Sequence, residues 1–189
     1  MKIKIALILL ILAFSVSEIF AKSDYGDLMK LKEIEVYTGL AKSQYCQPKK
    51  GYSFGLIGCN FGFDLLEKPY SKLLLEVETG PFVNPVIKPK NEIEFGADLL
   101  IKIGYKGWGK IMPYFKGGSG LIYASPKFER QSTKLNFLVQ AGSGISYFLN
   151  EKESINVEYR YRHFSNAGIK YPNGGVNVGE ILVGFSYLF

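Results

Sequence analysis

Residues that bind metals or cross-link secreted proteins are scarce in this chain, which has two cysteines and one histidine among its 189 residues. Cys46 and Cys59 have no histidine nearby, so we expect no zinc site. An oxidising compartment would permit a bridge between them. Because Cys46 falls in an expected loop and Cys59 within the next expected strand, their pairing stays open. The sequence indicates no metal and no organic cofactor.

Long apolar runs are missing beyond the beginning of the chain. No later segment approaches the roughly 18 consecutive apolar residues of a membrane-spanning helix, so we expect none. The run that does occur, 5–16, follows Lys2 and Lys4 and leads to the small residue Ala21. This order is typical of a secretory signal peptide over 1–21, with an uncleaved N-terminal anchor as the alternative.

Acidic residues are fewer than basic ones, and the net charge is +6. The basic residues are not interleaved with aromatic residues in a nucleic-acid-binding motif, so we expect no nucleic acid partner. An anionic lipid surface is the simpler partner for a basic exported protein.

Apolar and polar side chains alternate through most of the chain from Glu35 onward. Within 92–106 the apolar residues share one face, whereas Glu94, Asp98 and Lys102 share the other. A strand separates residues in this way, while a helix would spread the charges around its surface. Abundant glycine, tyrosine and phenylalanine also favour strands. Eight strands are expected, at 34–41, 53–65, 72–82, 92–106, 111–123, 135–149, 154–166 and 177–189.

The lengths of these strands and of their connections are typical of a barrel in a bacterial outer membrane. Most strands reach the roughly 9 to 11 residues that a tilted membrane strand needs. Long connections follow the odd-numbered strands and short ones follow the even-numbered strands, as extracellular loops and periplasmic turns do. The sequence therefore predicts an all-β fold, an eight-stranded antiparallel transmembrane barrel over 34–189. A short periplasmic segment at 22–33 precedes it.

The polar face carries acidic and basic residues together, which indicates the orientation of the wall. A soluble barrel of the lipocalin kind, the alternative, has an apolar interior. An eight-stranded interior is just filled by side chains, and an arginine facing lipid at the midplane costs about 2–4 kcal/mol. We expect an internal ionic network of Glu76, Glu78, Glu94, Asp98, Lys102, Glu158, Arg160 and Arg162.

In 53–65 the apolar residues change from one face of the strand to the other near Gly58, which indicates a bulge.

Segment 154–166 carries candidate catalytic residues at its extracellular end. Every second residue of this segment faces outward, and after Tyr161 the next two such positions are His163 and Ser165. We therefore expect both side chains on the lipid-facing side. A neutral imidazole can accept the proton of a hydroxyl nucleophile, and this is the only histidine. From the spacing alone, an amphipathic anchor at the membrane interface is the alternative.

The run from Tyr161 to Gly168, followed by Pro172-Asn173 and a Gly-rich turn, resembles the PagL-type lipid A 3-O-deacylases, also grouped as acyloxyacyl hydrolases. The shared pattern is His-aromatic-Ser-Asn-Ala-Gly, with Pro-Asn seven residues after Ser165. The resemblance implies an outer-membrane serine ester hydrolase acting on lipid A. It also implies the roles of single residues: Ser165 as nucleophile, His163 as base, and Asn166 with the N–H of Ala167 or Gly168 as oxyanion donors.

The chain departs from this family at the residue that orients the histidine. The family's glutamate falls on Asn177, which has outward parity, whereas Glu180 has inward parity. We expect Asn177 to orient His163, with a bulge that brings Glu180 around as the alternative. An amide oxygen accepts the imidazole N–H but stabilises the imidazolium less well than a carboxylate.

Basic residues of the expected loops indicate how lipopolysaccharide binds. We expect Lys127, Arg130 and Lys170 to contact the lipid A phosphates, at about 1 kcal/mol per cation near an anionic surface. One alternative is a passive structural or adhesive barrel with an inactive motif. Another is a related lipid enzyme, either a phospholipase or an acyltransferase; the charged inward face argues against an acyltransferase that buries its chain. A homodimer is left open.

Overall fold

The computed structural model describes residues 30–43, 51–65 and 72–189. The expected signal peptide, residues 22–29 of the expected periplasmic segment 22–33, and Cys46 lie outside the described residues. The strands are β1 (Leu31–Ser43), β2 (Ser53–Asp64), β3 (Leu73–Lys88), β4 (Glu92–Tyr105), β5 (Ile111–Ala124), β6 (Leu135–Phe148), β7 (Glu153–Ser165) and β8 (Val176–Leu188).

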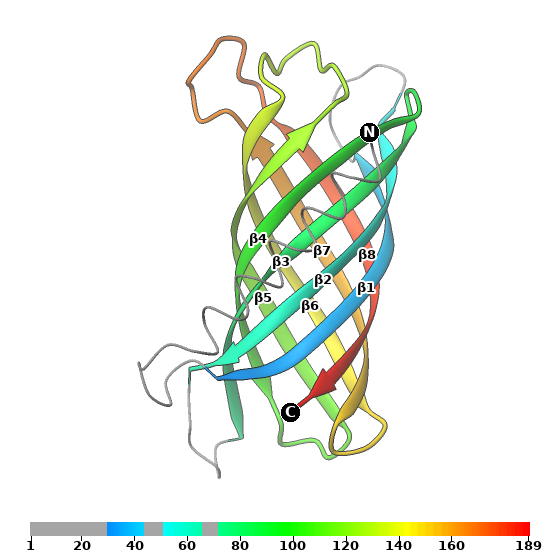
Figure 1. Cartoon of the computed structure of the whole chain (residues 1–189), viewed down its shortest axis with the longest axis vertical. Coiled ribbons are helices and arrows are strands. Elements are labelled where there is room, and N and C mark those ends of the chain that lie inside the picture. The colour runs from blue at the N-terminus through cyan, green and yellow to red at the C-terminus, as the bar shows by residue number, and fades with distance from the viewer. Residues whose placement is uncertain (1–29, 44–50, 66–71) are drawn as a thin grey trace.

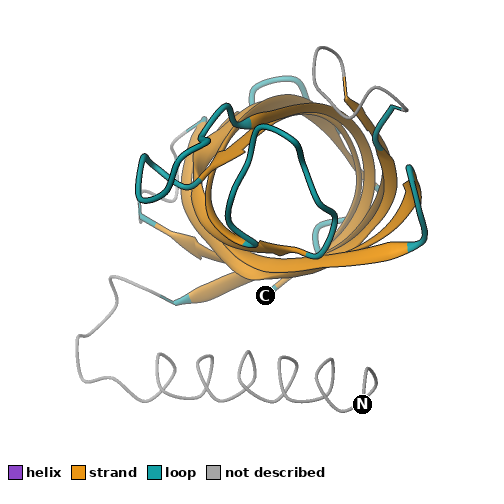
Figure 2. Ribbon diagram, turned by 90° about the horizontal axis from the view of Figure 1, so that it is seen from above, coloured by secondary structure: helices purple, strands orange, loops and turns teal. Residues whose placement is uncertain are grey.

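These strands form a closed antiparallel barrel (Figures 1 and 2). Each strand pairs with the next along the chain, and β8 returns to pair with β1 from Glu33↔Leu188 to Ser43↔Val178. Closure removes the sheet edges whose unpaired N–H and C=O groups a bilayer cannot satisfy. The predicted eight-stranded antiparallel barrel is confirmed. Among the described residues, no helix is long and apolar enough to cross a membrane.

The outer wall of the barrel presents large apolar side chains. On β4, Ile101 and Ile103 are 50% and 49% exposed, while Lys102 between them is 1% exposed. The same alternation occurs on β8, where Ile181 and Val183 are exposed and Leu182 is buried. An apolar surface of this extent is suited to the hydrocarbon of a bilayer.

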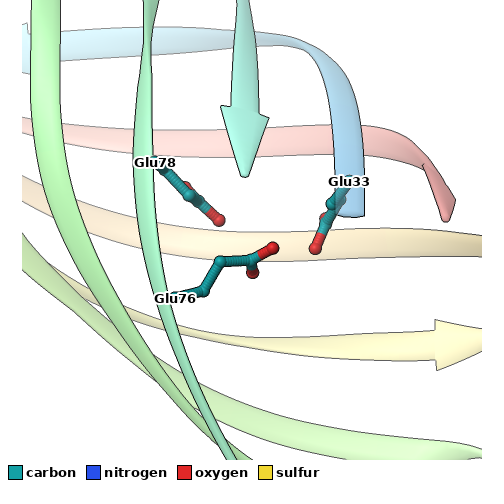
Figure 3. A group of neighbouring side chains, drawn as sticks. All are labelled: Glu33, Glu76 and Glu78. Atoms are coloured by element: carbon teal, nitrogen blue, oxygen red, sulfur yellow. The ribbon is translucent and has the colours of Figure 1, made fainter. Parts of the chain in front are cut away.

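At the end of the barrel where the C-terminus lies (Figure 1), the interior is filled by charged side chains of opposite sign. The carboxylates of Glu33, Glu76 and Glu78 converge there (Figure 3). The ammonium of Lys102 lies 2.7, 3.4 and 3.2 Å from their oxygens, so the chain itself supplies the compensating cation. Buried carboxylates are tolerated when paired in this way.

The ionic network continues toward the other end of the barrel through three further cations. The ion pairs are Lys116 with Glu35, Glu78 and Glu158; Arg160 with Glu158 and Asp98; and Arg162 with Glu94 and Glu180. The predicted internal network is confirmed, and Glu33, Glu35, Lys116 and Glu180 are additional members of it.

Beyond Arg162 the interior becomes apolar, which the predicted charged interior did not anticipate. Phe54, Leu138 and Phe164 are each 0% exposed and fill the lumen near the loops. Phe128 descends from the β5–β6 connection, and its ring centroid lies 5.6 Å from that of Phe164. Figure 2 shows one loop lying across the mouth of the ring, where Figure 1 places this connection. The loop end of the barrel is therefore packed and closed.

Two strand boundaries differ from the sequence-based prediction. β3 continues to Lys88, so a short connection over 89–91 replaces the expected long loop. Pro81 and Pro85 interrupt the sequence pattern, but both are aligned with β4 residues in the sheet. β1 begins at Leu31, inside the segment expected to be periplasmic, because Glu33 belongs to the internal ionic network.

The bulge expected near Gly58 is absent. β2 pairs with β1 without interruption from Glu33↔Gly62 to Lys42↔Ser53, and the irregularity of this pair lies between Leu31 and Glu33. Phe54, Leu56 and Asn60 all point inward, so the inward face of β2 changes from apolar to polar along the strand. This change in the inward residues produced the apparent switch of parity in the sequence.

Candidate active site

His163 and Ser165 lie on the outer wall at the loop end of β7, as their parity predicted. In the sheet they face Val139 and Phe137 of β6. On the other side His163 is aligned with Asn177 of β8. Phe164 between them is fully buried, which holds its two neighbours outward. The period of two thus brings the predicted residues together at the level where the barrel meets the loops.

The imidazole of His163 is hydrogen-bonded to Asn177. The distance from Nδ1 to Asn177 Oδ1 is 2.6 Å, and since a carbonyl oxygen can only accept, Nδ1–H is the donor. This tautomer leaves Nε2 as the basic nitrogen. Glu180 points into the barrel, where Arg162 Nε lies 3.1 Å from its carboxylate. The structure therefore brings Asn177, and not Glu180, to His163.

Gly175 supports the other edge of the imidazole and was missed by the sequence analysis. Its φ is +65°, and a Cβ built there would lie 3.0 Å from His163 Nε2 and closer still to Cε1. Glycine is therefore required both by the backbone conformation and by the space that the ring occupies. The Gly-rich turn before β8 was the available signal, but nothing in the sequence pointed it toward the histidine.

A sharp turn follows the nucleophile candidate. Ala167 and Gly168 have φ values of 52° and 82°, both in the left-handed region. The backbone N–H of Asn166 donates to Asn173 Oδ1 at 2.9 Å, which closes the turn across the loop. This hydrogen bond explains the Pro-Asn element of the sequence motif. A non-glycine residue in a left-handed conformation beside a candidate nucleophile is the kind of local strain that functional sites store.

The turn already uses most of the hydrogen-bond donors expected to hold an oxyanion. The amide Nδ2 of Asn166 donates to Lys170 O at 2.7 Å and to Ser132 Oγ at 3.1 Å. The N–H of Gly168 donates to Asn166 Oδ1 at 3.0 Å. Within residues 30–43, 51–65 and 72–189, the N–H of Ala167 makes no hydrogen bond, and neither does the Ser165 hydroxyl. The nucleophile candidate Ser165 and one backbone donor, the N–H of Ala167, are thus free two residues apart in the chain.

The predicted phosphate-binding residues lie on two loops joined to each other. Lys127 and Arg130 belong to the β5–β6 loop and Lys170 to the β7–β8 loop, and all three are exposed. Gly174 N–H donates to Arg130 O at 2.6 Å, and the Arg130 side chain lies over Gly174, next to the Gly175 that supports His163. Positive charge is therefore carried beside the candidate active site.

The wall below the candidate site is apolar. Phe137, Val139 and Tyr161 surround it and are 47%, 58% and 41% exposed. On the loop above, Tyr171 is 91% exposed. A molecule with acyl chains below and anionic groups above would match this division of the surface.

A closed barrel with an apolar outer wall, a charged interior and its longer described loops at one end defines the class of small outer-membrane β-barrels. Residues 66–186 match the model of the family described as Lipid A 3-O-deacylase (PagL). The chain belongs to this family, so the predicted membership and the outer-membrane location are confirmed. The protein is thereby a lipid A deacylase by family, with lipopolysaccharide as its substrate. A comparison with curated protein sequences finds no match.

Two solved structures share the fold. The crystal structure of the outer membrane enzyme PagL superposes with a TM-score of 0.58 and 16% sequence identity, over 80% of this chain and 97% of that chain. Neisserial surface protein A (NspA) gives a TM-score of 0.60 and 13% identity, over 86% of this chain and 100% of that chain. Because an enzyme and a surface protein match equally well, the barrel alone does not assign the chemistry.

Proposed function

We propose that the protein removes the 3-O-linked acyl chain of lipid A, with Ser165 as nucleophile and His163 as general base. The observation that carries the proposal is the hydrogen bond between His163 Nδ1 and Asn177 Oδ1, beside Ser165 on the lipid-facing wall. It holds the ring in the tautomer whose Nε2 can accept a hydroxyl proton. A structural histidine at this height of the wall needs no such partner.

The chemistry proceeds in two steps. Ser165 Oγ attacks the ester carbonyl while His163 Nε2 takes the hydroxyl proton of the serine. The bond between the acyl carbon and the sugar oxygen then breaks, and the sugar hydroxyl leaves with that proton. Water, deprotonated by His163, next attacks the acyl-serine; the bond between the acyl carbon and Ser165 Oγ breaks, His163 returns the proton to Ser165 Oγ, and the fatty acid is released. Ser165 must turn toward the imidazole when the substrate binds.

The oxyanion is held by the turn after the nucleophile. The N–H of Ala167 is the primary donor because it is unoccupied. Asn166 and Gly168, the other donors implied by the family motif besides Ala167, reach an oxyanion only if the turn exchanges its present hydrogen bonds when substrate binds. Preorganised donors of this kind are worth about a hundredfold to a thousandfold in rate each.

The substrate lies with its acyl chains along the outer wall and its phosphates at the loops. Phe137 and Val139 offer the apolar surface beside Ser165, and Lys127, Arg130 and Lys170 offer the cations. This orientation brings a glycolipid ester, at the junction of chain and sugar, to the level of Ser165. Because His163 is the only histidine of the sequence, Ser165 is the only serine at that level with an imidazole beside it on the wall.

Mass spectrometry of lipid A after incubation with the purified protein tests the proposal. The wild type should remove one hydroxyacyl chain from the 3-O position, and Ser165→Ala should remove none. Ser143→Ala, which changes another outward-facing serine on β6, is the matched control and should act like the wild type. Unchanged lipid A with folded wild-type protein would instead support a passive barrel, the alternative favoured by Asn177 in place of the family's glutamate.

A further inference from the structure

The β5–β6 and β7–β8 loops are joined by hydrogen bonds directly above the candidate active site. Ser132 N–H donates to Pro172 O at 3.0 Å, and Gly174 N–H donates to Arg130 O at 2.6 Å. Gln131 and Asn173 form an isolated bridge between the same loops. The β7–β8 loop, which begins right after Ser165, is therefore held by a loop remote from it in sequence.

The hydroxyl of Ser132 is the centre of this junction. It accepts a hydrogen bond from Asn166 Nδ2 at 3.1 Å and donates one to Lys170 O at 2.9 Å. Asn166 Nδ2 also donates to Lys170 O at 2.7 Å, so the three groups form a closed triangle. Asn166 is 1% exposed and adjoins Ser165, which means that the triangle is anchored next to the nucleophile.

We propose that Ser132 is a positioning residue for the deacylation reaction. Its hydroxyl holds the Asn166 side chain, and Asn166 Oδ1 in turn holds the Gly168 N–H, which sets the left-handed turn at Ala167 and Gly168. The orientation of the free Ala167 N–H relative to Ser165 depends on that turn. This inference rests on the proposed function and adds to it a residue outside the family motif and on another loop.

The location of Ser132 separates this role from one in folding. It lies in a loop between β5 and β6, outside the strand ladders that close the barrel. Its substitution by alanine leaves the packed end beneath, including Phe128 and Phe164, intact. The expected consequence is a less well-defined turn on an unchanged barrel, and a displacement of about 1 Å at a reacting group costs up to about a hundredfold in rate.

Steady-state kinetics on purified lipid A test the proposal with three variants. Ser132→Ala should lower kcat about tenfold to a hundredfold while KM stays within about twofold. Ser132→Thr keeps the hydroxyl and should restore most of kcat. Ser125→Ala is the control. Ser125 lies in the same loop as Ser132, and its hydroxyl accepts a hydrogen bond from Ile93 N–H of β4, but it makes no hydrogen bond with Asn166. A Ser132→Ala enzyme with wild-type kcat, or one that Ser132→Thr does not rescue, overturns the proposal.

A double-mutant cycle identifies Asn166 as the residue through which Ser132 acts. In an Asn166→Ala background, adding Ser132→Ala should lower kcat by less than about twofold, whereas independent effects would multiply and contradict the proposal. A failure of the proposed function can be told apart from a failure of the positioning role, because in the first case the wild-type protein itself leaves lipid A intact. A wild type that is active and equal to Ser132→Ala refutes the positioning role alone.

Discussion

At the scale of single residues, the imidazole of His163 is held from two sides. Asn177 accepts its Nδ1–H, and the bare Cα of Gly175 faces its Cε1–Nε2 edge. Both contacts come from β8 and the turn that precedes it, so the base is oriented by the strand next to its own. The ring is fixed without a carboxylate, which distinguishes this chain from the family pattern.

Replacing Asn177 with a carboxylate should speed the reaction. Asn177→Asp keeps the side-chain length of the present 2.6 Å hydrogen bond and adds a negative charge that stabilises the imidazolium formed in the transition state. We expect kcat to rise by about tenfold, and Asn177→Ala to lower it. Lipid A deacylation rates of the three proteins provide the measurement. An Asn177→Asp enzyme slower than Asn177→Ala would contradict the orienting role.

Filling the space at Gly175 should displace the base. Gly175→Ala places a methyl group against His163, and kcat should fall by about a hundredfold. Gly109→Ala is the control, because Gly109 also has positive φ (64°) but its Cβ would meet nothing within 4 Å. Both variants bear the left-handed backbone cost of about 1–2 kcal/mol. Equal kcat in the two variants would show that the contact with His163 is irrelevant.

The outward positions of His163, Ser165 and Asn177 could be predicted from the sequence because alternation along a strand determines the face of each residue. Gly175 and Ser132 could not, since their roles arise from contacts between loops, which follow no period. The same holds for the oxyanion donors: the motif named Asn166 and the N–H of Ala167 or Gly168, but it did not show that the turn already occupies Asn166 and Gly168.

At the scale of elements, the two joined loops carry the cations that meet the substrate. The β5–β6 loop holds Lys127 and Arg130, and the β7–β8 loop holds Lys170. Their basic character was predictable, but their hydrogen-bonded junction was not. The strands followed from alternation except where prolines or a changing interior obscured it, as in β3 at Pro85 and in β2 at Gly58.

Removing positive charge from the joined loops should weaken substrate binding. Arg130→Gln should raise KM for lipid A several-fold, consistent with about 1 kcal/mol per cation at an anionic surface, and leave kcat nearly unchanged. Lys110→Gln, at an exposed position before β5 at the opposite end of the barrel, should leave KM unchanged. The KM values at low and high salt check this, because screening should shrink the difference. A KM for Arg130→Gln equal to that of Lys110→Gln at low salt would exclude the loop from phosphate binding.

At the scale of the whole molecule, the barrel is an apolar cylinder around compensated charges, closed by aromatic side chains beneath the site. The ladder of paired cations and carboxylates keeps the lumen packed and leaves the outer wall to lipid. Alternation and charge predicted this arrangement, whereas the apolar closure around Phe54 and Phe128 depends on how a loop folds into the mouth.

Breaking the internal network should destabilise the barrel. Lys102→Met leaves the carboxylates of Glu33, Glu76 and Glu78 without their shared cation, and the free energy of unfolding should fall by about 3–5 kcal/mol. Lys106→Met, which removes an exposed lysine just after β4, should change it by less than about 0.5 kcal/mol. Urea unfolding in lipid vesicles measures both. Equal stability of the two variants would contradict the account of the interior.

The most direct test of the central claim is to trap the acyl-enzyme. Purified protein is mixed with lipid A, quenched in acid within its first turnovers, digested and analysed by mass spectrometry. The account predicts a hydroxyacyl adduct on the peptide that contains Ser165, absent from Ser165→Ala. Release of the fatty acid with no adduct on Ser165, together with continued activity of Ser165→Ala, would contradict it.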